Sequence, residues 1–220
     1  MQKAGLESVT QINVGLKLEK RGSGGCGVRG RMFKRIEEFD KFVSIIGFRN
    51  VKIIDVNQFV EKIRGATKPA LVQIFDADCV AGFEHLFFAI LNALRAFNQK
   101  NNISETADME SLLYASGQRQ IRKAIETIGV RSNTSNVAVL ILADDKLKIQ
   151  NGEKEVNGLI NGVRDDQVLE VRSEEKIHKL MKLFNVTELE LRSLSDRKAA
   201  DYKMITKLII ERGALLATSR

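Results

Sequence analysis

The chain has 220 residues, of which 44% are hydrophobic and 29% are charged, with 35 Lys and Arg against 28 Asp and Glu. That length can bury the core of one domain of ordinary size. The net charge of +7 excludes an acidic solvating chain and suggests an anionic partner such as nucleic acid. Two cysteines exclude a disulfide framework and fit a reducing compartment, and two histidines without a CxxC motif are too few ligands for a zinc site. No apolar run approaches the roughly 18 residues of a membrane span, so we expect a cytoplasmic protein that uses no membrane, metal or cofactor.

The excess positive charge is concentrated in the first 31 residues. Six basic and two acidic side chains give positions 1–31 a net charge of +4, so the remaining 189 residues carry only +3. Positions 21–31 read RGSGGCGVRGR, a glycine-rich run with little apolar surface to offset its backbone entropy. We expect 1–31 to be a disordered extension, or to result from a start codon assigned too early with Met32 as the true start. An Arg/Gly-rich segment can also bind RNA loosely.

Strands and helices alternate in the first part of the expected domain, which spans 32–220. We expect, in chain order, a strand at 48–54, a helix at about 57–64 capped by Asp55 or Asn57, a strand at 70–75 after Pro69, and a helix at 83–97. The last helix carries a continuous apolar stripe at helical spacing, formed by Phe83, Leu86, Phe87, Ile90, Leu91, Leu94 and Phe97.

Helices dominate the second part of the chain. We expect helices at about 106–115 and 118–128, a buried strand at 136–142, a weak helix near 154–160, a short strand at 168–171, and helices at 174–184, 187–193 and 197–217. The fold class is therefore mixed α/β, a single domain with helices packed on a small central sheet.

Cys79 and His85 lie six residues apart, around the start of the helix at 83–97. They could act as a nucleophile and its base if the loop between them folded back, although cysteine is more often a small buried hydrophobe. Because His85 lies off the apolar stripe, we expect it to face solvent or to make a polar contact.

Two pairs of aspartates follow the expected strands, Asp76 with Asp78 and Asp144 with Asp145. Such positions often hold ligands or Mg²⁺ in α/β sheets. No phosphate-binding loop of the GxxxxGK[ST] type is present, so a nucleotide enzyme is poorly supported. We expect these aspartates to be turn formers and helix caps.

The helix at 118–128 has two contrasting faces, with Ile121, Ala124, Ile125 and Ile128 opposite Arg119, Arg122, Lys123 and Glu126. The second face carries three positive charges and one negative charge. It could bind an anion, or it could be an ordinary solvated face with an Arg122–Glu126 pair.

A polar cluster of sequence SGQRQ precedes that helix. Ser116 is a natural N-cap, and Gly117 permits a ligand to approach closely. Free backbone N–H groups beside Gln118–Gln120 would suit a phosphate or a nucleic acid. Tyr114, just upstream, could stack on an unpaired base or lie in the core.

Two segments of the chain together resemble a known family. LLYASGQRQIRKAIETIGV (Leu112–Val130), preceded by EHLFFAILNALRAF (Glu84–Phe97), closely resembles the small regulatory subunit of the KEOPS complex. The resemblance covers about 68–142 well and the rest of the domain in outline. Positions 1–31 have no counterpart in it, and the loop at 144–162 is longer than the family suggests.

The resemblance implies a non-enzymatic role with no catalytic residues. KEOPS installs the threonylcarbamoyl group on tRNA adenosine, and this subunit binds an atypical kinase/ATPase, supports its activity, and in archaea captures the single-stranded 3′ CCA end of tRNA. The catalytic subunit of the complex would be only an indirect partner. A module that docks the kinase without touching RNA, or a small enzyme using Cys79 and His85, are the alternatives.

The resemblance also implies candidate contact residues. The tRNA-binding candidates are Ser116, Gly117, Gln118, Arg119 and Gln120, with Arg122 and Lys123 as outer phosphate contacts and His85 and Arg95 as further candidates. The kinase requires an exposed apolar surface. Met204, Ile205, Leu208 and Ile209 of the C-terminal helix could form it, or could equally be core residues.

Overall fold

The computed structural model describes residues 33–193 and 198–217, and its central element there is a five-stranded antiparallel sheet. The strand order is β1 (Phe33–Ile36), β2 (Lys41–Arg49), β4 (Val137–Ala143) and β3 (Leu71–Asp76), and the short β5 (Val163–Arg164) also pairs with β2. The expected mixed α/β class is confirmed. The expectation for 1–31, together with Met32, lies outside the described residues.

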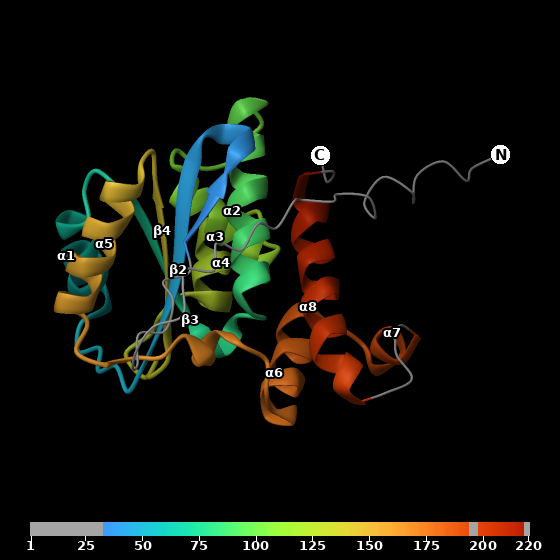
Figure 1. Cartoon of the computed structure of the whole chain (residues 1–220). Helices are drawn as coiled ribbons and strands as arrows, with labels where there is room; N and C mark the ends of the chain where they lie inside the picture. Colours follow the sequence, from blue (N-terminus) through green and yellow to red (C-terminus); the bar gives the residue numbers. More distant parts are fainter. Residues whose placement is uncertain (1–32, 194–197, 218–220) are drawn as a thin grey trace, which may run out of the picture. The chain divides into compact units, whose positions relative to one another are not determined.

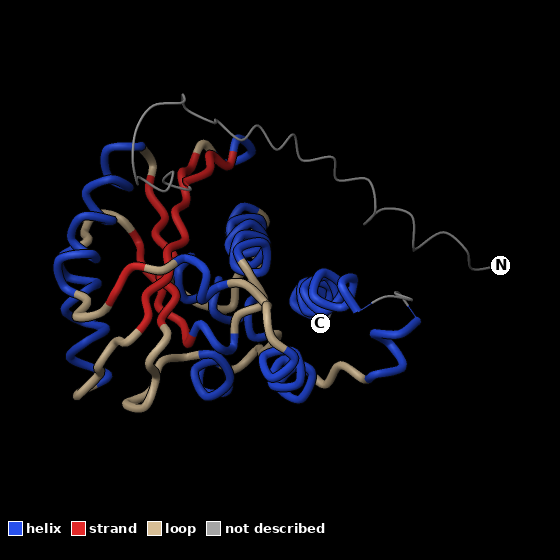
Figure 2. The backbone as a smooth tube through the Cα atoms, turned by 60° about the horizontal axis from the view of Figure 1, so that its bottom comes forward, coloured by secondary structure: helices blue, strands red, loops and turns tan. Residues whose placement is uncertain are grey.

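Helices cover both faces of the sheet (Figures 1 and 2). One face packs against α1 (Val56–Ala66) and α5 (Lys146–Leu159), and the other packs against α2 (Phe83–Asn98), α3 (Ala107–Ser116) and α4 (Ile121–Ile128). Alternate side chains of β4 therefore enter two separate hydrophobic clusters, with Leu140 in one and Ile141 in the other. Both faces are buried, which explains the uninterrupted apolar run in this strand.

Three helices follow near the C-terminus, of which the last packs against α2 and α3 and the other two pack against that last helix. They are α6 (Glu174–Phe184), α7 (Glu188–Ser193) and α8 (Lys198–Ala214), and a 3₁₀ turn, Leu215–Ala217, follows α8. Gly213 permits a very close approach, because a Cβ atom there would lie 2.5 Å from the Tyr114 carbonyl oxygen. The end of α8 is thereby held against the end of α3.

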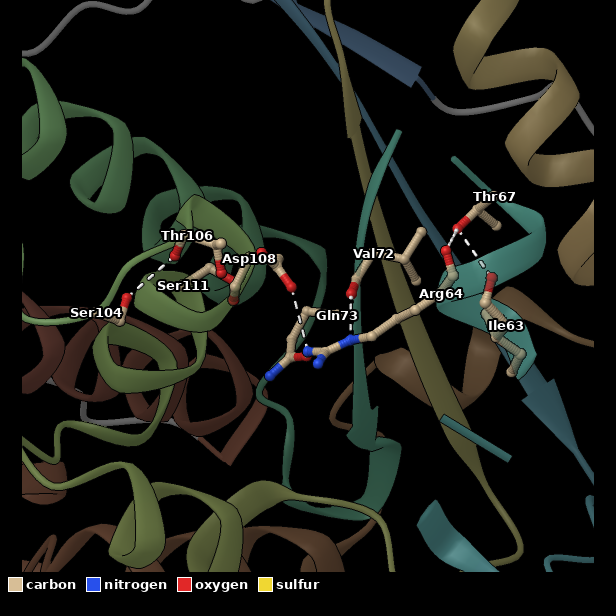
Figure 3. A network of polar contacts seen from close by, with 9 residues as sticks. All are labelled: Ile63, Arg64, Thr67, Val72, Gln73, Ser104, Thr106, Asp108 and Ser111. Atoms are coloured by element: carbon tan, nitrogen blue, oxygen red, sulfur yellow. Dashed lines mark hydrogen bonds and ion pairs between the residues drawn. The ribbon is translucent and has the colours of Figure 1, made fainter. Parts of the chain in front are cut away.

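An arginine ties the two helical layers together around the edge of the sheet (Figure 3). Arg64 extends from α1 across the edge strand β3, where its Nη2 donates to Gln73 Oε1 at 2.7 Å. The same nitrogen lies 3.2 Å from Asp108 Oδ2 at the start of α3, and Nε donates to the Val72 carbonyl at 3.4 Å. The Val72 carbonyl, on the outer edge of the sheet, thus accepts a hydrogen bond from a side chain.

Most predicted elements are present, but two strand predictions are wrong. The strand expected at 48–54 is β2 at Lys41–Arg49, and Asn50, with φ +57°, turns the chain out of the sheet immediately after it. The strand expected at 168–171 is a 3₁₀ helix, Asp166–Leu169, which the Asp165 side chain caps by accepting from Gln167 N–H. The weak helix expected near 154–160 is the longer α5, because Asp145 caps it nine residues before Lys154.

Candidate nucleic-acid interface

The α3–α4 connection differs from the expected helix start. Gly117 has φ +65° and ends α3 in the left-handed conformation, while α4 begins only at Ile121. Ser116 is therefore the last residue of α3 and not an N-cap. Its hydroxyl donates to the Leu113 carbonyl at 3.0 Å and accepts from Gln118 N–H at 3.3 Å. Residues 117–120 connect the two helices, with Gly117 and Gln118 half-buried and Arg119 and Gln120 exposed.

This turn forms one wall of a hollow of about 490 Å³, which we call the first hollow. The other walls are the end of α6 and the end of α8. The lining residues are Ser116, Gly117, Gln118, Arg119, Gln120, Lys123, Leu183, Phe184, Asn185, Arg212, Leu215 and Leu216. Three of these side chains are cationic and none is a carboxylate, so the hollow is suited to an anion.

Several polar groups of the first hollow have no partner within the described part of the chain. They are the side-chain amides of Gln118 and Gln120 and the ammonium group of Lys123. Arg119 is held in place, since its Nη1 donates to the Leu216 carbonyl at 3.3 Å. The structure thus brings Lys123 and the whole predicted SGQRQ cluster to one site.

Arg122 does not line the first hollow. Its side chain is 91% exposed and pairs with Glu126 at 3.0 Å. Arg122 therefore belongs to an ordinary solvated helix face, which was the alternative interpretation. Of the two residues expected to contact outer phosphates, only Lys123 lines the first hollow.

The sequence reasoning missed the contribution of the C-terminal residues to this site. Arg212 Nη2 donates to Glu190 Oε1 at 2.8 Å and to the Asn185 carbonyl at 2.9 Å, and its buried Nε has no hydrogen-bond partner among the described residues. No local motif marks Arg212 or Leu216, because they reach the turn only through packing of α8 on α3.

A smaller hollow of about 180 Å³, the second hollow, adjoins the first and shares Arg119 and Leu216 with it. Its remaining lining residues are Asn92, Arg95, Ala96, Gln99, Asn101, Ile103, Tyr114 and Ala217. Arg95, expected as a further tRNA contact, lies here and pairs with Glu38 at 2.9 Å.

His85 is buried, with only 2% of its surface exposed, so the expectation that it faces solvent is wrong. The alternative, a polar contact, is what the structure shows. Ala81 N–H donates to Nδ1 at 3.1 Å, and Nε2 lies 2.8 Å from the Ala115 carbonyl, which makes Nε2 the protonated nitrogen. Burial lowers the pKa of His85 to about 4. The side chain is thus not placed to contact tRNA and instead holds the end of α3.

Cys79 and His85 do not form a nucleophile–base pair, because both His85 nitrogens are bonded to backbone groups. The Cys79 thiol is buried, and burial together with the nearby Asp76 carboxylate raises its pKa to about 11. Such a thiol is a poor nucleophile at neutral pH. Among the described residues, no group of three His, Cys, Asp or Glu side chains could hold a metal ion.

Asp76 and Asp145 have the expected roles of turn former and helix cap. Asp76 accepts from Asp78 N–H at 3.0 Å, and Asp145 caps α5 by accepting from Lys148 N–H at 2.8 Å. Asp144 pairs with Lys41.

Comparison with known proteins gives two matches. The family model of the kinase-binding protein CGI-121 matches residues 48–216. The regulatory protein Cgi121 of Methanocaldococcus jannaschii is 33% identical over 114 residues, which cover 52% of this chain and 70% of that protein. The chain belongs to the CGI-121 family. It is therefore a member of a regulatory, kinase-binding family, as its resemblance to the KEOPS subunit implied.

The residues of α8 expected to form a kinase surface are buried or half-buried in this CGI-121 family member. Ile205 and Ile209 are buried in the same hydrophobic cluster as α2 and α3, and Met204 and Leu208 pack against it. The alternative of core packing applies, because α8 turns its apolar side chains toward the rest of the domain.

Among the described helices of this family member, none combines the length and apolarity that a bilayer crossing requires.

The apolar face expected on α4 is only half buried. Ala124 and Ile128 are fully buried, whereas Ile121 and Ile125 remain 40% and 46% exposed. Their exposure follows from the position of α4 at the outside of the helical layer, where neighbouring helices cover only one side of it.

Proposed function

We propose that this chain is a non-catalytic subunit of the KEOPS tRNA-modification complex. It binds the atypical kinase/ATPase of the complex, supports that enzyme's activity, and recruits tRNA by its single-stranded 3′ CCA end. The kinase part rests on membership of a kinase-binding family. The RNA part rests on one observation, the cationic first hollow formed by the SGQRQ turn and the end of α8.

The chemistry of the first hollow favours single-stranded RNA over a duplex. Proteins recognise single strands by combining cationic groups for the phosphates with polar and planar groups for splayed bases. Arg119, Lys123 and Arg212 supply the positive charge, and the amides of Gln118 and Gln120 are available to hydrogen-bond base edges. The hollow lies within the 300–1,000 Å³ range of typical ligand pockets.

A charge reversal in the first hollow tests the RNA part of the proposal. Binding of unmodified tRNA to the purified chain is measured by fluorescence anisotropy for the wild type, Arg119→Glu and Arg122→Glu. We expect Arg119→Glu to weaken binding at least tenfold, since it replaces an attractive contact by a repulsive one. Arg122→Glu is the matched control, because Arg122 lies outside the hollow, and it should change affinity less than threefold.

Removal of the CCA end from the same tRNA should abolish measurable binding to the wild type. Equal binding by the trimmed and intact tRNA, or unchanged binding by a folded Arg119→Glu variant, would contradict the site assignment. A stable complex with the kinase together with absent or salt-insensitive tRNA binding would instead select the alternative function, a docking module without RNA contact.

A further inference from the structure

The walls of the first hollow come from three separate segments of the chain, which are the α3–α4 turn, the end of α6 and the end of α8. Their alignment therefore depends on contacts made behind the hollow, where α8 packs against α2, α3 and α6 (Figure 1). His85 of α2 lies in this buried region and lines neither hollow. Its contacts nevertheless reach all three of the segments that supply the walls.

The first of these contacts is with the end of α3. The last carbonyls of a helix have no intrahelical partner, and a buried one requires a donor from elsewhere. The Tyr114 carbonyl accepts from Gly117 N–H at 3.4 Å, and the Ala115 carbonyl accepts from His85 Nε2 at 2.8 Å. Ala115 is only 1% exposed, so solvent does not readily replace this donor. The hydrogen bond thus fixes the backbone directly before Ser116, where the wall begins.

The imidazole ring also contacts the end of α6. Its centroid lies 5.7 Å from that of the Phe184 ring, and the two planes are nearly perpendicular at 83°. This edge-to-face arrangement is one of the favourable geometries for aromatic pairs. Phe184 is a lining residue of the first hollow. One side chain of α2 therefore supports two walls from behind.

The other ring nitrogen extends the network to α8. His85 Nδ1 accepts from Ala81 N–H at 3.1 Å, and the Ala81 carbonyl accepts from the Thr206 hydroxyl of α8 at 2.9 Å. These contacts require an imidazole that donates through one nitrogen and accepts through the other, which is the neutral form. Burial favours that form by lowering the pKa of His85 to about 4.

We infer that His85 is a positioning residue for RNA binding, which aligns the three walls of the first hollow without contacting the RNA. This inference rests on the proposed function, since it concerns the same site. Groups that bind a ligand act together only when their supports hold them in the required geometry. The cationic side chains and the amides of the first hollow belong to different walls, so their cooperation depends on this buried network.

Two substitutions of His85 separate its hydrogen bond from its bulk. Leucine is of similar size but cannot donate, whereas glutamine keeps an N–H donor for the Ala115 carbonyl. Fluorescence anisotropy with unmodified tRNA measures the affinity of the full chain at neutral pH, at a temperature where thermal unfolding shows each variant to be folded. We expect His85→Leu to weaken binding about tenfold and His85→Gln to recover part of that loss.

A control variant distinguishes positioning from a general loss of stability. Ile149 of α5 is fully buried in the hydrophobic cluster on the other face of the sheet. Ile149→Ala should destabilise the domain but leave the affinity for tRNA unchanged. Hydrogen exchange followed by mass spectrometry should show faster exchange at 113–120 in His85→Leu, and no such change there in Ile149→Ala.

Thr206→Val tests the network at a second point, because valine keeps the shape of threonine and removes the donor to the Ala81 carbonyl. We expect it to weaken tRNA binding about twofold to fivefold. If His85→Leu does not fold, Thr206→Val and His85→Gln decide the question. The inference is overturned if the folded variants of His85 and Thr206 bind tRNA as the wild type does, or if Ile149→Ala weakens binding as much as they do.

The two proposals fail in distinguishable ways. If the wild type does not bind tRNA, the proposed function fails, and the inference fails with it. If Arg119→Glu abolishes binding while the His85 and Thr206 variants keep the wild-type affinity, only the inference fails.

Discussion

Arg212 combines a structural contact with a place in the wall of the first hollow. It lines the first hollow, yet its guanidinium is engaged by Glu190 of α7 and by the Asn185 carbonyl. The pKa of Glu190 is lowered, chiefly by hydrogen bonds from Thr187 and also by Arg212, so its carboxylate is charged at neutral pH. A phosphate in the hollow would have to compete with this carboxylate for Arg212.

Neutralising Glu190 should therefore strengthen RNA binding. We predict that Glu190→Gln raises the affinity for tRNA about twofold to fivefold, because Arg212 is released toward the hollow. Glu175→Gln makes the same change of net charge on an exposed position of α6 and serves as the control. Anisotropy titrations at one salt concentration compare the variants, and an equal gain in both would refute a specific role of Glu190.

His85 should make the stability of the domain depend on pH. Burial lowers its folded-state pKa to about 4 from 6.5, so below pH 6.5 the unfolded chain takes up a proton that the folded chain does not. The free energy of unfolding should thus fall by about 3 kcal/mol as the pH drops from 6.5 to 4, at roughly 1.4 kcal/mol per pKa unit. Protonation of Nδ1 would also remove the acceptor for Ala81 N–H.

Urea unfolding at a series of pH values measures this effect. His85→Gln should be less stable at neutral pH but should show a flatter pH dependence than the wild type. His178→Gln, at an exposed position, should retain the wild-type dependence. A wild-type slope that persists in His85→Gln would show that another group is responsible.

At the scale of elements, the Arg64 contact across β3 joins α1 to α3. Asp108 is buried, and one of its carboxylate oxygens already lacks a hydrogen-bond partner among the described residues. Loss of the arginine would leave a buried charge at the start of α3, the helix whose other end lines the first hollow. The contact is therefore important for the placement of α3.

We predict that Arg64→Ala lowers the free energy of unfolding by about 2–4 kcal/mol, since breaking a partly buried pair strands the remaining charge. Denaturant unfolding measures the loss. Adding Asp108→Asn to Arg64→Ala should recover part of it, because the stranded group is then neutral. If the two substitutions were simply additive, the contact would not couple the elements.

At the scale of the whole molecule, the net charge of +7 overstates the local field at the site. Four of these charges lie in positions 1–31, and the first hollow contains three cationic side chains. The salt dependence of RNA binding should reflect the three cationic side chains of the first hollow and not the net charge of the chain, because only phosphates that are contacted release counterions.

The salt dependence of tRNA binding measures that number. For single strands each neutralised phosphate contributes about 0.7 to the slope of log affinity against log salt, so three contacts predict a slope of about −2. Seven contacts would give a slope of about −5. Anisotropy titrations of the full chain between low and moderate salt distinguish the two values, and the steeper slope would indicate that charge outside the hollow takes part.

Local sequence determined much of this protein. The apolar stripe of α2, the buried β4 and the break between two helices at Ser116–Gly117 could be predicted, because helix periodicity and turn chemistry depend on residues only a few positions apart. Residues 118–120, expected as the first turn of the second helix, instead belong to the connection before Ile121. The same local signals identified most elements of the fold and one wall of the first hollow.

Only the tertiary structure decided which side chains are buried and which segments meet. His85 lies off the apolar stripe of α2, yet α3 covers it, and Ile205 is inward-facing because α8 packs on the domain. Arg212 and Leu216 complete a site whose first wall lies about a hundred residues earlier in the chain. Such contacts depend on how the layers pack against one another, which no short window of sequence records.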